Sequence, residues 1–299
     1  MNARLAGTVA AVLFAAANVD AMPIHLVPNR ATYELRLEHT SPGGAVAGRG
    51  RMVIQFRDTC DGWSTAQRMI ADITNADGVI TRTDSLVAAW ESKDGKAMRF
   101  DVKSVNGGKS DKDKRGTAEV ADDGSVTVTL LAPVRRQFTL PHGTIFPSEQ
   151  TIELADAASR GPGMVKRHVF QGGDEGDYYV STSVIGHPAP AAATVAERAI
   201  DKAGLLRNVA AWSVLVSYFA DKRSADLPDY EIASRLYANG IIGSMSLIYS
   251  RYTLHASLTR LEPLLTTCSG DAAAHMRQRK TQDWSNVLTH SDSDNGIAH

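Results

Sequence analysis

The chain lacks long hydrophobic runs, an excess of charge of either sign, and all but two cysteines. After residue 21 no apolar stretch reaches the roughly 18 residues that a membrane-spanning helix needs. Its 32 Lys and Arg residues nearly balance 33 Asp and Glu residues, for a formal net charge of −1. No global field therefore recruits nucleic acid or an anionic membrane. These absences argue against membrane-spanning and nucleic-acid-binding classes of protein.

The first 21 residues have the pattern of an export signal. One early cation, Arg4, precedes an uncharged run from Leu5 to Ala17, and small residues follow as far as Ala21. The apolar run is too short to cross a bilayer of about 30 Å, so it predicts a cleaved signal rather than an anchor. We therefore expect a soluble, exported mature protein, with the signal peptide covering residues 1–21.

The two cysteines, Cys60 and Cys268, have two readings. Exported proteins reach compartments where disulfides persist, and an even cysteine count there favours a bridge over metal binding or catalysis. The alternative is two separate buried thiols. We predict that Cys60 and Cys268 form the bridge.

Alternation with a period of two residues dominates the rest of the pattern. Apolar and charged residues alternate over Tyr33–Glu38 and again over Met52–Arg57, as in strands with one face on a core and one in solvent. Turn pairs separate many of these segments: Asp94-Gly95, Asp123-Gly124 and Asn239-Gly240. Such pairs are typical of type I′ hairpins. The pattern predicts an all-β fold of about twelve strands in a mainly antiparallel, meandering sheet.

Only two segments indicate helices. The first begins at Ser148, which we interpret as its N-cap, and ends at Arg160 before Gly161, with apolar residues on one narrow face. The second, over about Thr194–Leu206, follows the linker-like segment His187–Pro190. That linker could divide two domains, but a bridge between the two cysteines would tie the first half of the chain to the last. We therefore expect a single domain over 22–268, followed by a polar and mobile tail over 269–299.

No catalytic, cofactor-binding or metal-binding motif stands out. The chain has no G-x-S-x-G elbow, so Ser244 and Ser246 are interpreted as ordinary strand residues. No two of the nine histidines have the i, i+4 spacing of a metal-binding helix. His142, between Pro141 and Gly143, is the one histidine in a turn that could suit a site. The sequence therefore predicts no catalytic residue, no cofactor and no metal.

Several short segments together resemble the EipB cell-envelope integrity family of exported bacterial proteins. They occur in order from about Thr32 to Cys268. The segments are Cys60-Asp61-Gly62-Trp63, Gln67-Arg68, Trp90–Gly95, Arg99-Phe100, Phe146-Pro147, Tyr218-Phe219, Leu227–Glu231, Leu236-Tyr237, Asn239-Gly240 and Leu261-Glu262. The chain departs from the pattern at Ile248, where an acidic residue is expected before Tyr249, and in its long tail.

This resemblance implies a non-enzymatic periplasmic protein that supports envelope integrity. The implied fold is a strongly curved, spiral-like or barrel-like antiparallel sheet, similar to the LolA and LolB lipoprotein carriers. One helix covers its open face, and it encloses an apolar cavity. The resemblance also implies a disulfide, carried here by Cys60 and Cys268, and a periplasmic partner with tetratricopeptide repeats.

Two functions remain open from the sequence. The first is a binding or scaffold module for an apolar, lipid-like ligand, a periplasmic protein partner, or both. The second is a hydrolase of envelope material with an unrecognised site, using His142 or acidic residues near the mouth of the sheet. The absence of clustered catalytic residues and the resemblance favour the first.

Overall fold

All strands of the computed structural model belong to one sheet. The structure describes residues 24–173, 178–189, 193–220 and 227–266. Fourteen strands occur in these segments, where the sequence predicted about twelve, and their order in the sheet is β8-β7-β6-β5-β4-β3-β2-β1-β14-β13-β12-β11-β10-β9. The elements are β1 (Asn29–Thr40), β2 (Ala45–Asp58), β3 (Gly62–Asn75), β4 (Ile80–Ser92), β5 (Ala97–Asn106), β6 (Lys109–Val120), β7 (Val126–Ala132), β8 (Arg136–Leu140), α1 (Pro147–Arg160), β9 (Gly163–Phe170), β10 (Tyr178–Pro188), α2 (Val195–Ile200), β11 (Ala211–Ala220), β12 (Tyr230–Tyr237), β13 (Ile242–Tyr249) and β14 (Tyr252–Pro263). The predicted mainly antiparallel all-β fold is confirmed.

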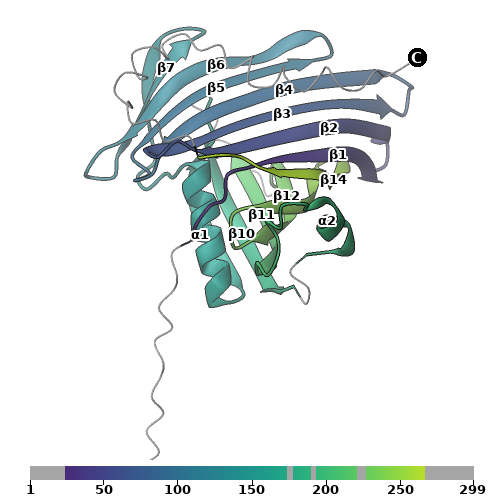
Figure 1. Ribbon diagram of the computed structural model, residues 1–299. Helices are drawn as coiled ribbons and strands as arrows, with labels where there is room; N and C mark the ends of the chain where they lie inside the picture. Colours follow the sequence, from purple (N-terminus) through teal and green to yellow (C-terminus); the bar gives the residue numbers. More distant parts are fainter. Residues whose placement is uncertain (1–23, 174–177, 190–192, 221–226, 267–299) are drawn as a thin grey trace, which may run out of the picture.

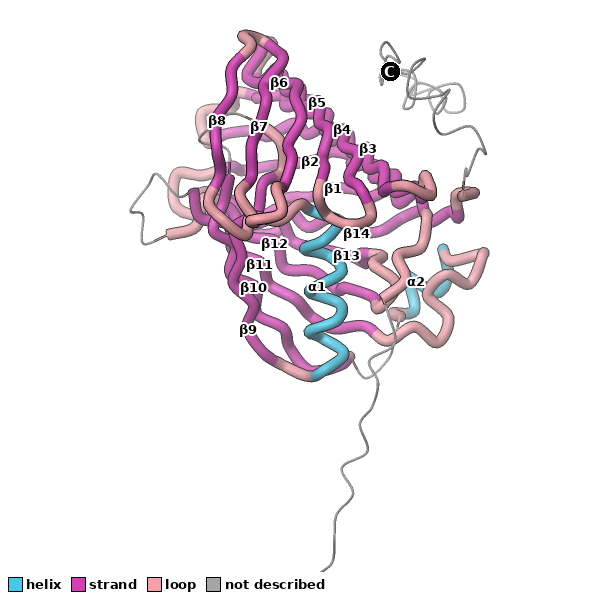
Figure 2. Tube along the Cα trace, turned by 90° about the vertical axis from the view of Figure 1, so that its left-hand side faces the viewer, coloured by secondary structure: helices cyan, strands magenta, loops and turns pink. Residues whose placement is uncertain are grey.

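The sheet curls until its two edge regions meet. In Figures 1 and 2 the strands β1 to β8 form an upper wall and β9 to β14 a lower wall, with α1 lying along the lower one. After β8 the chain reaches β9, where Ile145 forms a parallel bridge with Val169. The N–H of Ile145 donates to the carbonyl of His168 at 2.9 Å, and the N–H of Phe170 donates to the carbonyl of Ile145 at 3.0 Å. The result is a barrel-like shell closed by a short bridge.

The first and last parts of the chain are joined at the centre of the sheet. β1 pairs with both β2 and β14, so the strands before and after the linker-like segment belong to one continuous sheet. Pro188 at the end of β10 even pairs with Trp212 of β11. The predicted signal over residues 1–21 and the predicted tail over 269–299 lie outside the described residues.

Helix α1 packs on the inner face of the lower wall. Leu154, Ala155 and Ala158 share a buried cluster with Val214 and Val216 of β11, so the predicted narrow apolar face is found, although Ile152 is not among its buried residues. The predicted N-cap is wrong. Phe146 occupies the N-cap position without a side-chain cap, and Ser148 lies in the first turn because Pro147 can begin the helix itself.

Helix α2 is shorter than the sequence predicted. It begins after Thr194, which forms a capping box with Glu197, and ends before Asp201. The carboxylate of Asp201 then accepts the N–H groups of Leu205 (2.7 Å) and Leu206 (2.8 Å). These bonds hold the chain in turns, which explains why the helix does not continue to Leu206.

The three predicted hairpins are present, but their turn type differs from the prediction. Only the glycine of each pair has a positive φ: 70° at Gly95, 79° at Gly124 and 79° at Gly240. Each glycine N–H donates to the carbonyl three residues before it, on Ser92, Ala121 and Tyr237. This is a type I turn followed by a left-handed glycine, which needs one positive φ rather than the two of type I′.

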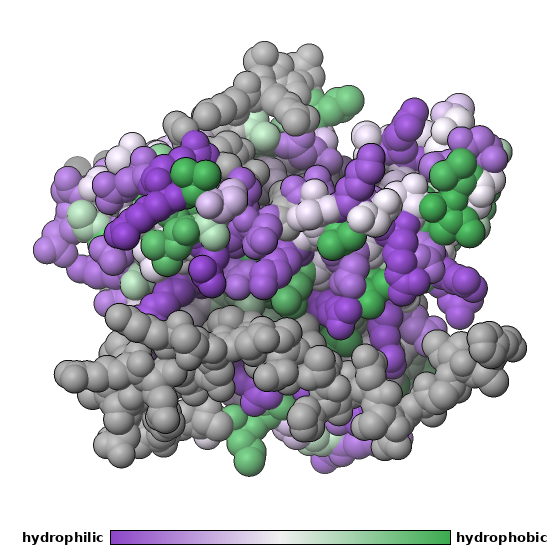
Figure 3. All heavy atoms as spheres, turned by 90° about the horizontal axis from the view of Figure 1, so that it is seen from above, coloured by the Kyte–Doolittle hydropathy of each residue, from purple (hydrophilic) through white to green (hydrophobic). Residues whose placement is uncertain are grey.

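Buried side chains line the inside of the shell. One cluster joins Tyr33, Leu35 and Met52 to β13 and β14, and another joins β4 to β8 with Phe146 and Phe170. Seen from above, the outer surface is mainly hydrophilic with separate apolar patches (Figure 3). The core therefore lies on the inner face of the sheet, where the alternation of apolar and polar residues places the apolar side chains.

Candidate binding groove

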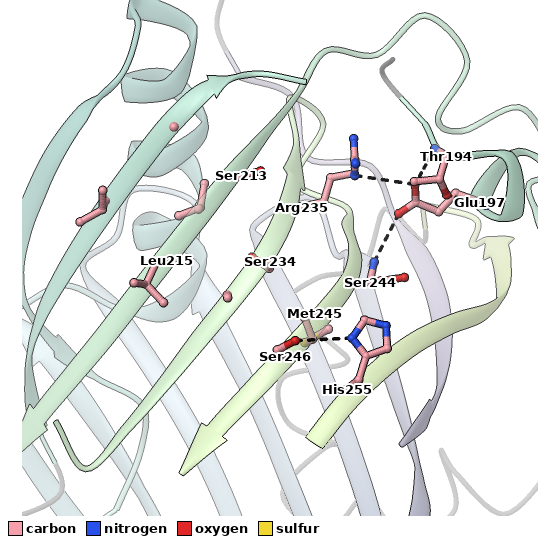
Figure 4. Close-up of a pocket in the computed structure, with 14 residues that line it drawn as sticks. Thr194, Glu197, Ser213, Leu215, Ser234, Arg235, Ser244, Met245, Ser246 and His255 are labelled. Carbon is pink, nitrogen blue, oxygen red and sulfur yellow. Dashed lines mark hydrogen bonds and ion pairs between the residues drawn. The ribbon is translucent and has the colours of Figure 1, made fainter. Parts of the chain in front are cut away.

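A groove of about 500 Å³ lies on the outer face of the lower wall (Figure 4). Its lining includes a row of directly paired residues across five strands: Val184, Leu215, Ala233, Ser246 and His255. The side chains of the row face outward, because the neighbours of Leu215 on β11 pack inside the shell against α1. With about 4.8 Å between neighbouring strands, the row is about 19 Å long.

The groove changes from apolar to polar along this row. At the β10 end Val184 is 45% exposed, and its partner on β9, Met164, is 70% exposed. At the β14 end the Ser246 hydroxyl donates to Glu38 Oε2 at 2.8 Å and lies 3.4 Å from His255 Nδ1. A molecule in the groove would therefore contact apolar side chains at one end and hydrogen-bonding groups at the other.

Small side chains form much of the groove floor. Gly186, Ser213, Ala233 and Ser244 line it, and none projects far from the sheet. Larger residues at these positions would fill the space. The groove thus results from outward positions that carry small residues on adjacent strands.

Glu197 of α2 closes one side of the groove and holds α2 to the sheet. Its buried carboxylate accepts hydrogen bonds from the Thr194 N–H (2.8 Å), the Tyr237 hydroxyl (3.0 Å) and the Ser244 N–H (3.3 Å). Arg235 Nε lies 3.8 Å from it (Figure 4). Burial opposes ionisation, but these hydrogen bonds together keep the pKa of Glu197 below its ordinary value. An ionised carboxylate therefore fixes this side of the groove.

The arrangement of Ser246 and His255 differs from that of a hydrolase. A serine nucleophile must give its proton to the histidine, whereas the Ser246 hydroxyl donates to Glu38. His142, the other residue considered for chemistry, is distant from Ser246 and His255 in the sequence. Its ring contacts the carbonyl of Asp123 in the β6–β7 turn. Within the described part of the chain, no three His, Cys, Asp or Glu residues are grouped to hold a metal ion.

Of the two predicted disulfide residues, the structure places one. Cys60 lies in the β2–β3 turn with a φ of 71°, and its N–H donates to Asp58 Oδ1 at 2.8 Å. No free cysteine occurs among the described residues. Cys268 lies outside them, so the bridge stays a prediction. The aromatic residue beside the turn, Trp63, stacks on Phe56 with ring centroids 5.2 Å apart.

Sequence reasoning missed the groove. Ser244 and Ser246 are strand residues as predicted, but their meeting with His255 and Glu197 depends on the register of β13 with β14 and on the position of α2. The capping-box pattern from Thr194 to Glu197 was the one local signal. It gives the start of α2 without showing which strands the carboxylate reaches.

These features define a class of barrel-like antiparallel β-proteins with a helix packed inside a single curled sheet. Residues 20–265 match the model of the EipB-like family. The chain belongs to this family.

Two known proteins show the similarity in detail. The cell envelope integrity protein EipB of Brucella abortus (strain 2308) is 30% identical over 252 residues, which cover 83% of this chain and 88% of that protein. A crystal structure of a beta-barrel-like protein of a domain of unknown function, also from Brucella abortus, superposes with a TM-score of 0.73 at 29% identity. The match covers 81% of this chain and all of the other. Neither name refers to an enzymatic activity.

Proposed function

We propose that this chain is a non-enzymatic periplasmic protein that supports cell-envelope integrity by binding an apolar or amphiphilic ligand in the outer groove. The envelope role is supported by the family and by the name of the Brucella relative. Periplasmic location is supported by the export pattern of residues 1–21. Among the described residues, no helix is long and apolar enough to cross a membrane.

The observation that carries this proposal is the polarity of the groove. Its volume of about 500 Å³ falls in the range of about 300–1,000 Å³ that small-molecule sites occupy. Exposed Val184 in the groove and exposed Met164 beside it on β9 would contact a hydrocarbon chain, which gains free energy by leaving water. Ser246 and His255 at the other end would hydrogen-bond to a polar head group. An amphiphile satisfies both ends at once.

A protein partner is a second part of the proposal. The family resemblance implies a periplasmic protein with tetratricopeptide repeats, which could bind the shell with or without a ligand in the groove. Cross-linking in cells followed by stringent purification tests this. Recovery of chaperones alone would remove the partner and leave the ligand proposal standing.

The ligand proposal can be tested by native mass spectrometry of the protein purified from its own periplasm. We expect wild type to carry a non-covalent lipid-like mass. Val184→Asp and Leu215→Asp should lower its occupancy at least tenfold, because a carboxylate would be desolvated by a hydrocarbon chain.

The matched control is Val46→Asp, the same change at an exposed valine on β2, 61% exposed. It should keep the ligand. Equal occupancy in Val184→Asp, Leu215→Asp and Val46→Asp would contradict groove binding. An empty wild-type protein would contradict the ligand proposal as a whole.

A further inference from the structure

The row of outward-facing residues that lines the groove continues onto two arginines. His255 of β14 pairs with Arg36 of β1, and Arg36 pairs with Arg49 of β2. Arg36 faces outward because its neighbour Leu35 belongs to the inner cluster. Arg49, as its direct partner across the strands, faces the same way, and both arginines are exposed. The three strands lie next to one another in Figure 1, so the arginine pair extends the row beyond its polar end.

Two like charges stand opposite each other in this pair. Directly paired residues of neighbouring strands have Cβ atoms about 5 Å apart, so Arg36 and Arg49 repel each other. Within the described part of the chain Arg49 forms no ion pair, and Glu34 lies 3.6 Å from Arg36. The Arg36 and Glu34 side chains are 79% and 57% exposed, so water screens their attraction. An anion that contacts both guanidinium groups would relieve the repulsion.

The carboxylates nearest to the arginine pair do not neutralise it. Glu34 pairs across the strands with a further arginine, Arg51. Asp72 pairs with Arg49 in the register of the sheet, but its carboxylate also lies 3.9 Å from Arg82 Nε. Each of these carboxylates is therefore shared with a second arginine. A local positive charge remains, although the whole chain has a formal net charge of −1.

Side chains of β1 reach the groove across β14. Glu38, two residues after Arg36, accepts the hydrogen bond of the Ser246 hydroxyl on β13 at 2.8 Å, although β14 lies between the two strands. The longer side chain of Arg36 starts directly beside His255, which lies next to Ser246 in Figure 4. Arg49 is one strand spacing farther, about 4.8 Å. An anionic group beside His255 is therefore within reach of both guanidinium groups.

We propose that the groove binds amphiphiles with a phosphate head group, and that Arg36 and Arg49 bind the phosphate oxygens. This inference rests on the proposed function of the groove and adds the charge of its ligand. Guanidinium groups present paired N–H donors that match the oxygens of a phosphate, and one phosphate has enough oxygens to contact two arginines. The hydrocarbon chain would then lie along the row toward Leu215 and Val184. The head group would thus lie at the β14 end, over β1 and β2.

Two amphiphiles with the same hydrocarbon chain test the proposal, octyl phosphate and the uncharged octyl glucoside. Titration calorimetry of the full chain below the micelle-forming concentrations should show about tenfold tighter binding of octyl phosphate, because its hydrogen bonds to arginine are charge-assisted. Arg36→Gln combined with Arg49→Gln should remove this preference and leave the affinity for octyl glucoside unchanged. Val184→Asp should weaken the binding of both amphiphiles, because it changes the apolar end that they share.

The matched control is Arg160→Gln combined with Arg260→Gln, which removes the same charge at arginines that are 61% and 68% exposed. It should keep the preference, and both double variants should melt like wild type because all four arginines are exposed. A preference that survives Arg36→Gln with Arg49→Gln, or that the control also loses, would overturn the head-group assignment. So would equal wild-type affinity for the two amphiphiles, which leaves groove binding itself standing. Inorganic phosphate that binds as tightly as octyl phosphate would indicate a site for the free anion instead, and no binding of either amphiphile would overturn the groove proposal as well.

Discussion

The buried carboxylate of Glu91 on β4 accepts a hydrogen bond from the backbone N–H of Ser148, 57 residues later, at 2.8 Å. It takes the place of a local cap at the start of α1 and ties the upper wall of the shell to the helix. Burial raises the pKa of Glu91 to about 7, while the hydrogen bond from Ser148 acts in the opposite direction. The join between wall and helix therefore includes a carboxyl group that titrates near neutral pH.

This titration predicts that stability falls as pH rises. The folded pKa of about 7 lies above the ordinary value of 4.5, so the contribution is complete below pH 4.5 and is lost as pH rises through 7. The shift corresponds to about 3 kcal/mol of unfolding free energy. Glu91→Gln should remove this part of the pH dependence in urea unfolding between pH 4.5 and 8, and Glu119→Gln, at an exposed site on β6, should not. Equal pH slopes in wild type and Glu91→Gln would contradict the assignment.

Glu197 should show the opposite dependence. Its pKa is lowered, because hydrogen bonds to the carboxylate outweigh burial, so its contribution is present above the ordinary pKa of 4.5 and is lost as pH falls below it. Glu197→Gln should lower stability by about 1–3 kcal/mol at pH 7, with a smaller difference at pH 4. Glu34→Gln, which changes an exposed carboxylate near Arg36, should cost less than about 0.5 kcal/mol. An equal loss from Glu197→Gln at both pH values would contradict a lowered pKa of Glu197.

Gly243 makes room for the Glu197 carboxylate. A Cβ at this position would overlap Glu197 Oε1 and crowd Tyr237 and Arg235. Gly243→Ala should therefore destabilise the protein by about 1–3 kcal/mol and loosen α2. Gly163→Ala is the control, because no atom lies within 4 Å of its Cβ position. Thermal unfolding compares the two, and equal melting temperatures would show that Glu197 can move aside at little cost.

Alternation along the chain was enough to predict the fold class and the inner face. Tyr33, Leu35 and Met52 are buried where the period of two residues placed them. The contact of Glu91 with Ser148 could not be predicted, because it depends on how far the sheet curls. The pairing of β1 with β14 also joins segments more than 200 residues apart, and no local pattern encodes it. The groove depends on the same long-range register.

The predicted bridge between Cys60 and Cys268 can be tested through stability and thiol titration. Phe56 near Cys60 is two strands from Pro263, a distance that the residues up to Cys268 can span. Such a bridge would close a loop of about 209 residues and contribute roughly 5 kcal/mol by chain entropy. Cys60→Ser, Cys268→Ser and the double variant should therefore lower the melting temperature equally. Two titratable thiols in denatured, unreduced wild type would exclude the bridge.

We propose that this protein supports the envelope through its outer groove. Survival of the host on a membrane-disrupting detergent after deletion of the gene tests this role. Deletion should reduce survival at least tenfold, and the wild-type gene and Val46→Asp should restore it. Val184→Asp combined with Leu215→Asp should not, at equal protein level in the periplasm. Full survival of the deletion strain would contradict the envelope role, and full rescue by the groove variant would contradict the role of the groove.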